Sequence, residues 1–536
     1  MSAYDGLDEH REPRMIKGFR QIASLTAISR VFGMVRDMAF AHFFGAGWLS
    51  TAWTMGFKIP NLARRLFGEG AASASLIPVY SEQLHSNPEQ AKRLANTAVT
   101  VLFVLLAAIV IVGEILVWSY YSFFETRTGP RLGLLLCSIM LPYMICICIV
   151  AILAGILNVH RHFATPAAAP IVLNTCIIAS LLFTGWVMKI KPQQQVFFVA
   201  VAVLFSGFVQ IAIQIPPLRA RGISIRPAWD IHSEPFKKVI IMMGPMILGL
   251  TVTQLNTLGD DIIALCFMNE RGDPLGYGAP AHLYYAQRLY QFPLGVLGIS
   301  LATAIFPVMS SDAARKDFDA LTKTIARGIK TAVFVAIPAT AGIFLVAKPL
   351  VSALFEHGNF NSEDTPIVAL TLSFYAVGLC GYFSQQVTTR AFYSIQDSKT
   401  PARSAVYAVV ANIFLNLTLI WFLGTAGLAA ATAACSYLQV VILVRALRRK
   451  LGRSILDGLR ITLAKTVAAT AVMFLTGSAI MILMRNLPDG RSFDVFRLAV
   501  VVPSAVVVYT LAAKFLHIEM LSLFTGGKPR QKKNVV

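Results

Sequence analysis

The stretch Ser29-Arg-Val-Phe-Gly-Met-Val-Arg-Asp37 lies inside an apolar run from about residue 22 to residue 44. An arginine at the centre of a bilayer costs at least about 2.5 kcal/mol, so such residues usually face a protein interior or a water-filled cavity. At about 100° per residue, Arg30, Gly33 and Asp37 share one helix face, and Arg36 lies on a neighbouring face. The stretch therefore predicts a membrane helix whose polar side lines a cavity.

The composition places the whole chain in a membrane. Of its 536 residues, 56% are hydrophobic and 14% are charged, whereas soluble domains carry about 25% charged residues. Apolar runs of about 20 residues, each long enough to cross a hydrocarbon core, recur along the chain. The sequence thus predicts an all-α polytopic membrane protein. Loops on one side of the membrane account for the net charge of +20, so nucleic acid is not an expected partner.

The apolar runs predict about 14 membrane-spanning helices. A cytoplasmic N-terminus places most Lys and Arg residues on the cytoplasmic side, and an even number of spans then places both termini in the cytoplasm. The predicted spans are 17–44, 50–80, 93–122, 131–157, 165–188, 194–217, 239–267, 281–311, 325–347, 365–393, 402–423, 426–446, 462–484 and 496–516.

A weak internal repeat suggests that the spans form two related lobes. Pro60 and Pro78 in the second span are echoed by Pro293 and Pro307 in the eighth. Repeats of this kind place a substrate site near the bilayer midplane between the lobes. The expected parts are a polar cytoplasmic N-terminal extension, an N-lobe, a C-lobe, two C-terminal helices and a basic cytoplasmic tail, over residues 1–16, 17–220, 235–450, 456–518 and 519–536 respectively.

Arginines in the first two spans are candidates for binding an anionic substrate. The guanidinium fork matches phosphate oxygens bidentately and stays charged when it is desolvated, which favours Arg36 and Arg64 as ligand contacts. Structural ion pairs are the alternative for the other polar residues of these spans. The pairs in question are Arg30 with Asp37 and Arg65 with Glu69.

The eighth span carries a further candidate, Arg288. Gln287 and Gln291 stand beside it, and the neighbouring tyrosines would complete a polar wall suited to a sugar. Snorkelling of this arginine to the membrane interface is the alternative interpretation.

A second polar cluster is expected in the C-lobe. Asp260, beside Asp261, lies in the seventh span, while Asn412 and Asn416 are four residues apart in the eleventh and Thr432 lies in the twelfth. Carboxylate, amide and hydroxyl oxygens could replace water around Na⁺. Two alternatives stay open at this point. Protonation would keep Asp260 neutral, and Asn and Thr side chains also hydrogen-bond membrane helices together.

Three motifs resemble the signatures of the MurJ (MviN) family of lipid II flippases, within the multidrug/oligosaccharidyl-lipid/polysaccharide exporter superfamily. They are the stretch from Ser29 to Asp37, Phe57-Lys-Ile-Pro-Asn-Leu-Ala-Arg-Arg-Leu-Phe-Gly-Glu-Gly-Ala71 and Ala286-Gln-Arg-Leu-Tyr-Gln-Phe-Pro-Leu-Gly-Val-Leu-Gly298. The resemblance implies two six-helix lobes in a V, followed by two helices beside a groove for a polyprenyl tail. It also implies a transporter rather than an enzyme.

The implied substrate is lipid II, undecaprenyl-pyrophosphoryl disaccharide-pentapeptide. It would be moved from the inner to the outer leaflet of the bacterial cytoplasmic (inner) membrane for peptidoglycan and cell wall synthesis, and hence for cell shape. Membrane lipids and cell-wall synthesis proteins are further implied partners. No cofactor is expected, and coupling to Na⁺ or H⁺ is implied.

Carried over by motif, the family's cavity arginines fall on Arg30, Arg36, Arg64 and Arg288, and its sodium site falls on Asp260, Asn412, Asn416, Thr432 and the backbone carbonyl near Leu428. The chain departs from the family at four positions. Thr51, Gln287, Gln291 and Asn416 stand where family members often or sometimes carry acids.

The expected mechanism is alternating access, with helix bends at Pro60, Gly68, Gly70 and Pro293 allowing one lobe to rock against the other. Three other functions remain open. A flippase for another polyprenyl-linked glycan would use the same arginines. A cation-coupled drug antiporter would favour an acidic cavity. A non-transporting scaffold that presents a lipid would need no path to both leaflets.

Overall fold

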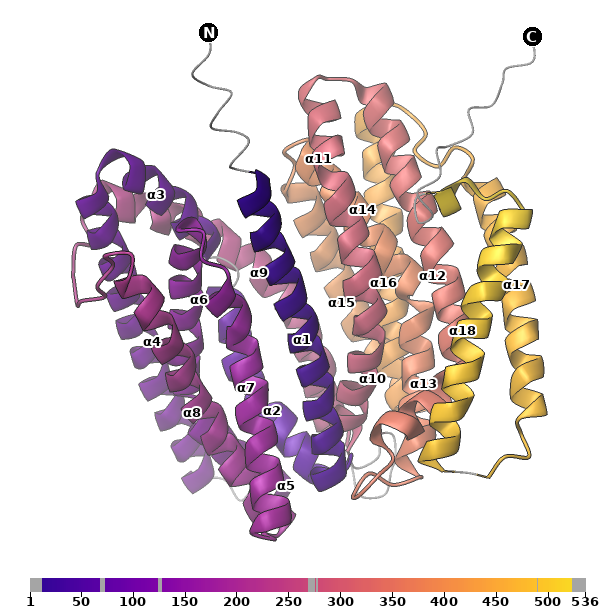
Figure 1. Ribbon diagram of the computed structural model, residues 1–536, viewed down its shortest axis with the longest axis horizontal. Helices are drawn as coiled ribbons and strands as arrows, with labels where there is room; N and C mark the ends of the chain where they lie inside the picture. The colour runs from indigo at the N-terminus through magenta and orange to yellow at the C-terminus, as the bar shows by residue number, and fades with distance from the viewer. Residues whose placement is uncertain are drawn as a thin grey trace. The chain divides into compact units, whose positions relative to one another are not determined.

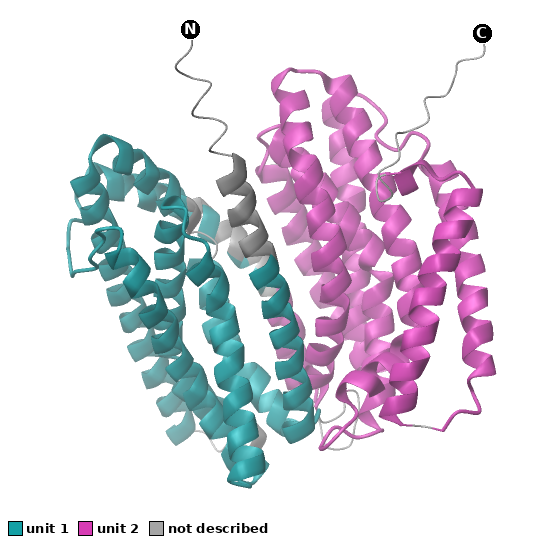
Figure 2. Ribbon diagram, in the orientation of Figure 1, with its two compact units in different colours: residues 1–254 teal, residues 255–536 magenta. Residues whose placement is uncertain are grey.

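The computed structural model describes residues 12–67, 73–123, 128–268, 275, 278–488 and 490–522, and most of these residues are helical. The helices fall into two compact units, residues 1–254 and residues 255–536 (Figures 1 and 2). The division falls inside one long helix, whereas the sequence places the lobe boundary in the polar segment before that helix. The predicted domain limits stay a prediction.

The first unit contains eight helices and most of a ninth. They are α1 (Glu12–Phe44), α2 (Trp48–Ala63), α3 (Ser73–Ser86), α4 (Pro88–Phe123), α5 (Thr128–Met140), α6 (Tyr143–Val159), α7 (Ala164–Leu182), α8 (Pro192–Arg219) and α9 (Glu234–Cys266). Helix α1 packs on α7, α2 on α5 and α6 on α8. Small residues allow the closest approaches: a Cβ added at Gly56 of α2 would lie 3.1 Å from the backbone nitrogen of Cys137 in α5.

The second unit contains the end of α9 and nine further α-helices. They are α10 (Ala279–Pro293), α11 (Ser300–Ala314), α12 (Phe318–Phe355), α13 (Asp364–Val377), α14 (Leu379–Ser394), α15 (Lys399–Leu423), α16 (Thr425–Leu451), α17 (Leu459–Leu483) and α18 (Arg491–Phe515). A π-helical turn, Leu294–Ile299, follows Pro293, where the sequence predicts a bend. The last two helices pack against each other and against α12.

Within the described residues, nine helical stretches are long and apolar enough to cross a membrane, or up to 11 if each of two bent pairs is one span. The bends are 41° between α5 and α6 and 40° between α13 and α14. The three other predicted spans, 17–44, 50–80 and 239–267, lie on α1, on α2 with α3, and on α9. These helices carry intramembrane charges and polar residues, and they are not among the spans identified by length and composition. The predicted count of 14 is therefore not confirmed.

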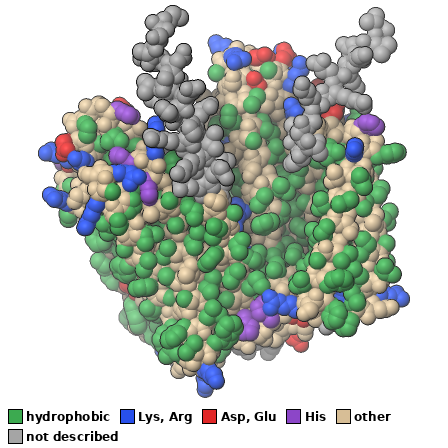
Figure 3. All heavy atoms as spheres, in the orientation of Figure 1, with side chains coloured by type: hydrophobic (Ala, Val, Ile, Leu, Met, Phe, Trp, Pro, Cys, Tyr) green, Lys and Arg blue, Asp and Glu red, His purple; other side chains and the backbone are tan. Residues whose placement is uncertain are grey.

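The surface of the helices supports the membrane assignment. On the face in Figure 3, hydrophobic side chains cover the middle of the helices, and Lys and Arg side chains gather near their ends. Helix α4 exposes large apolar side chains along its length, among them Phe103, Ile111 and Leu116. Such a surface is stable where hydrocarbon rather than water surrounds it.

Helices α15 and α16 lie close together at Gly427. A Cβ at this position would lie 2.5 Å from the carbonyl oxygen of Leu419 and 2.7 Å from its carbonyl carbon. Backbone atoms cannot rotate away, so we expect Gly427→Ala to force the two helices apart and to lower the apparent Tm in detergent. The matched control is Gly133→Ala, whose Cβ would meet Ala52 at an ordinary 3.7 Å. An unchanged Tm for Gly427→Ala would contradict this packing.

The Asp397 carboxylate joins the turn between α14 and α15 to α16. Burial would raise its pKa, but hydrogen bonds from Lys450 and from the Thr400 hydroxyl and backbone N–H outweigh it and lower the pKa to about 2. The folded pKa lies below the unfolded value of about 3.9, so this stabilisation is present above about pH 4 and is lost as the pH falls towards 2.

We therefore expect Asp397→Asn to lower the apparent Tm at neutral pH and to flatten its decline between about pH 4 and pH 2. Thermal unfolding across this range measures both effects. Identical pH profiles for the variant and the original chain would contradict the assignment.

Candidate functional site

Arg36 is the most firmly held of the predicted substrate-binding residues. Its Nε and Nη2 donate to Asp37 Oδ1 at 3.0 and 2.7 Å, and its Nη1 donates to Asn174 Oδ1 at 2.9 Å. The Asp37 residue is 2% exposed. Asn174 belongs to α7, which packs against α1, and its Nδ2 also donates to the Ser29 carbonyl at 3.5 Å. The guanidinium is therefore oriented by two helices.

The alternative that Arg30 pairs with Asp37 is wrong, because Arg36 occupies the Asp37 carboxylate. The Asp37 side chain is buried, and the long Arg36 side chain folds back to reach it. Asn174 then accepts the remaining hydrogen bond from Arg36. Arg30 is exposed on α1.

Arg64 and Arg65 lie in a short π-helical turn over residues 64–67, directly after α2. The Arg64 Nε donates to Asn61 Oδ1 at 3.1 Å, and the Arg64 side chain is half-buried. Arg65 is exposed, and its Nη1 donates to Gln254 Oε1 at 3.0 Å. The two consecutive arginines therefore contact different partners, Asn61 and Gln254, within the same unit.

Some predicted features of this segment lie outside the described residues. Glu69, the expected partner of Arg65, is one of them, as are the hinge glycines Gly68 and Gly70. The ion-pair alternative for Arg65 and Glu69 therefore stays a prediction. Pro60 is described, and it lies buried inside α2.

Arg288 of α10 sits against aromatic side chains in the second unit. Its Nη2 donates to Tyr284 Oη at 3.0 Å, and its guanidinium carbon lies 4.7 Å from the centroid of the same ring. Gln287 donates from Nε2 to Tyr375 Oη of α13 at 3.1 Å, and Gln291 is half-buried. The helix thus presents a wall of amide, hydroxyl and guanidinium groups.

The second polar cluster forms a connected network in the second unit. Asp260 is 2% exposed, and its Oδ1 accepts from Asn416 Nδ2 at 2.6 Å while its Oδ2 accepts from Thr432 Oγ1 at 3.1 Å. Asn416 Nδ2 also donates to Asn412 Oδ1 at 2.9 Å. The hydroxyl of Thr432 lies 3.0 Å from the Leu428 carbonyl. The structure therefore brings together the five residues of the expected cation site.

The chemistry of this network fits a hard cation. It contains carboxylate, amide, hydroxyl and backbone carbonyl oxygens, the ligand types that suit Na⁺, although Asn416 turns its Nδ2 towards Asp260 and Asn412. Among the described residues, the buried Asn416 Oδ1 has no hydrogen-bond partner, so it is the amide oxygen of the network that is not yet engaged. In the described part of the chain, no three His, Cys, Asp or Glu residues group as metal ligands.

An apolar cavity of about 490 Å³ lies between α12, α17 and α18. Its walls include Pro338 and Gly342 of α12, Met473 of α17, and Ala505 and Tyr509 of α18. The Tyr509 hydroxyl donates to the Phe334 carbonyl at 2.7 Å, so little polar surface remains. Such a cavity can take a hydrocarbon chain.

Sequence reasoning missed several partners that position these side chains. Asn174 and Tyr375 were not singled out, and the contact of Gln254 with Arg65 was not expected. A signal existed for Asn174, since it is a polar residue inside the apolar span 165–188. Tyr375 carried no signal, because tyrosine is common in membrane helices and its partner Gln287 lies on a distant part of the chain.

The family was tested by comparison with known proteins. A family model described as lipid II flippase MurJ matches residues 40–500. A probable lipid II flippase MurJ of Vibrio cholerae is 33% identical over 447 residues, covering 81% of this chain and 83% of that protein. The lipid II flippase MurJ of Burkholderia cenocepacia is 29% identical over 448 residues, covering 81% of this chain and 84% of that protein.

Solved structures show the same fold. A lipid II flippase MurJ in an inward closed conformation matches with a TM-score of 0.75 at 22% identity, covering 92% of this chain and 99% of that chain. An inward-facing multidrug resistance MATE family transporter of the MOP superfamily matches with a TM-score of 0.63 at 15% identity, covering 81% of this chain and 98% of that chain. The predicted family and helical fold class are confirmed, and the chain belongs to the lipid II flippase MurJ family.

Proposed function

We propose that this chain moves lipid II from the inner to the outer leaflet of the bacterial cytoplasmic membrane by alternating access, for peptidoglycan synthesis. Both termini would lie in the cytoplasm. Membership of the lipid II flippase MurJ family supports lipid II as the substrate. The observation that carries the chemistry is the oriented Arg36, held by Asp37 and Asn174 in a helix that also bears Arg30.

A pyrophosphate head group explains why arginines are useful here. The hydration shell of the pyrophosphate is a main barrier to spontaneous crossing of a bilayer, and guanidinium groups can replace that shell with charge-assisted hydrogen bonds. Asp37 compensates the charge of Arg36 when no anion is bound, which lowers the energy of the empty carrier. Arg30, Arg64, Arg65 and Arg288 are proposed to supply the remaining positive charge.

The amphiphile's tail requires a separate, apolar surface. The cavity between α12, α17 and α18 supports this part of the proposal, since its lining is almost wholly hydrocarbon. A polyprenyl chain could stay there or in lipid while the head group enters the polar region. No charged side chain lines the described wall of this cavity.

We further propose that a monovalent cation is coupled to transport. Asp260, Asn412, Asn416, Thr432 and the Leu428 carbonyl would hold Na⁺, which would supply a positive charge to the buried Asp260 carboxylate. Protonation of Asp260 is the alternative way to neutralise it. Either event changes the charge of a cluster that joins α9, α15 and α16.

The function is tested by depleting the protein in its native cell and measuring lipid II in each leaflet. Accumulation in the inner leaflet and loss from the outer leaflet is the expected result. An unchanged distribution, in a strain lacking any other lipid II flippase, would favour another polyprenyl-linked glycan or a non-transporting scaffold. Cysteine accessibility of residue 36 from both membrane faces would separate these two outcomes.

Arg36→Ala is expected to insert normally into the membrane and to lose flipping activity. Arg36→Lys keeps the charge but cannot contact Asp37 and Asn174 together, so we expect at least a tenfold loss. The measurement is restoration of outer-leaflet lipid II in depleted cells, normalised to membrane protein level. Arg93→Ala, an exposed arginine on α4, is the matched control. Full activity of Arg36→Ala would disprove the role of Arg36.

Asp260→Asn is expected to abolish the effect of Na⁺ on stability. If Na⁺ binds, the purified chain should show an apparent Tm higher by roughly 3 °C in NaCl than in choline chloride at equal ionic strength. The exposed Glu363→Gln in the same unit should retain this difference. A Na⁺ effect that survives in Asp260→Asn would exclude this site. The absence of any Na⁺ effect in the original chain would favour protonation.

A further inference from the structure

The break between α13 and α14 has an unusual hydrogen-bonding environment. Two carbonyls at the break accept side-chain hydroxyls from neighbouring helices: Thr340 donates to Ala376 at 2.7 Å and Tyr437 donates to Val377 at 2.6 Å. In hydrocarbon, backbone groups released by a helix break must be satisfied within the protein. The break is therefore a built feature of the membrane region.

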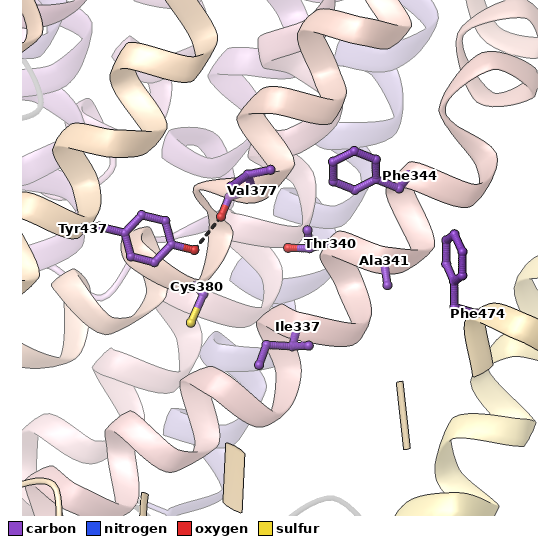
Figure 4. A pocket seen from close by; sticks show the side chains of 8 residues that line it. All are labelled: Ile337, Thr340, Ala341, Phe344, Val377, Cys380, Tyr437 and Phe474. Carbon is purple, nitrogen blue, oxygen red and sulfur yellow. Dashed lines mark hydrogen bonds between the residues drawn. The ribbon is translucent and has the colours of Figure 1, made fainter. Parts of the chain in front are cut away.

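A cavity of about 400 Å³ adjoins this break (Figure 4). It is lined by Ile337, Thr340, Ala341 and Phe344 of α12, Val377, Cys380, Tyr437 of α16 and Phe474 of α17. In Figure 4 the rings of Phe344 and Phe474 lie near each other on one side, and the Tyr437 hydroxyl points to the Val377 carbonyl. Both hydroxyls of the lining are thus engaged with the backbone, and the remaining wall is apolar.

The mouth of this cavity is continuous with the lipid-facing surface. Phe344, Val377, Tyr437 and Phe474 are each more than a third exposed, at 47%, 40%, 39% and 38%. Helices α12 and α17 both qualify as membrane spans. Bilayer hydrocarbon therefore surrounds the mouth. The cavity forms a concave surface, whereas the outer faces of helices such as α4 are convex.

This cavity is distinct from the one between α12, α17 and α18. Adjacent residues of α17 face different cavities, Met473 the cavity beside α18 and Phe474 the cavity at the break. On α12, Ala339 lines the cavity beside α18, and Ala341, two residues later, lines the cavity at the break. Two apolar sites therefore lie on opposite sides of the α12–α17 contact.

We propose that the cavity at the α13–α14 break binds one acyl chain of a membrane phospholipid. The chain fills the space between Ile337, Ala341, Phe344 and Phe474, and it packs against the break without competing for the carbonyls, which already have donors. A head group is unsuitable as the occupant because the lining offers no charged side chain. An ordinary bilayer lipid is the source because the mouth opens directly onto the bilayer.

Photocrosslinking tests the proposal. The full chain is reconstituted in vesicles of phosphatidylethanolamine and phosphatidylglycerol containing a phospholipid with a diazirine in one acyl chain, and adducts are mapped by mass spectrometry. We expect adducts on residues 337–344 and on Phe474 at least fivefold above those on the convex face of α4. Labelling of this cavity at the level of α4 would mean ordinary surrounding lipid and would overturn the proposal.

Two variants on the same helix make the test specific. Ala341→Trp fills this cavity and should reduce its labelling at least fivefold, while Ala339→Trp projects into the other cavity and should leave the labelling unchanged. If Ala341→Trp does not give a monodisperse, helical protein, the smaller Ala341→Leu replaces it. Equal labelling of the filled variant and the original chain would disprove binding at this place.

The source of the chain is tested by competition. Excess undecaprenyl phosphate should leave the phospholipid adducts at this cavity in place. Displacement of those adducts would identify an isoprenoid occupant and overturn the phospholipid assignment. The experiment measures lipid occupancy only, so its result is independent of whether the chain flips lipid II.

Discussion

Each charged or polar group placed at membrane depth needs a partner, and this requirement organises both units of the molecule. At the start of the chain, Arg36 is balanced by Asp37 and fixed by Asn174. Desolvating a guanidinium or a carboxylate is costly, and pairing the two lowers that cost. Together they form a group that is close to neutral. The same contacts fix the orientation of the Arg36 guanidinium between α1 and α7.

In the second unit, uncharged polar groups at membrane depth also have hydrogen-bond partners. Asp260 is surrounded by amide and hydroxyl groups from α15 and α16, and the carbonyls of the α13–α14 break accept hydroxyls from α12 and α16. Helix α16 takes part in both places, through Thr432 and, five residues later, Tyr437. A change in the charge of the Asp260 cluster would thus act on a helix that also caps the break.

The fold alone does not reveal the substrate. The chain shares its architecture with MATE transporters of the MOP superfamily as well as with a lipid II flippase, and one architecture can host many functions. What separates the two classes here is side-chain chemistry. The first unit carries Arg30, Arg36, Arg64 and Arg65 on α1 and directly after α2, and basic groups suit a pyrophosphate better than a cationic drug.

The sequence by itself determined the membrane class, the all-helical fold, the family and the residue types of both polar clusters. It could do so because hydrophobic length and intramembrane charge are local properties that hydrocarbon strongly constrains. Only the tertiary structure decided which polar groups meet. In the structure, Asp37 forms an ion pair with Arg36 rather than with Arg30. Arg65 donates a hydrogen bond to Gln254, and Gln287 donates one to Tyr375. These choices depend on helix rotation and on which distant helices pack together, and helical periodicity places a residue on a face without naming the residue opposite it.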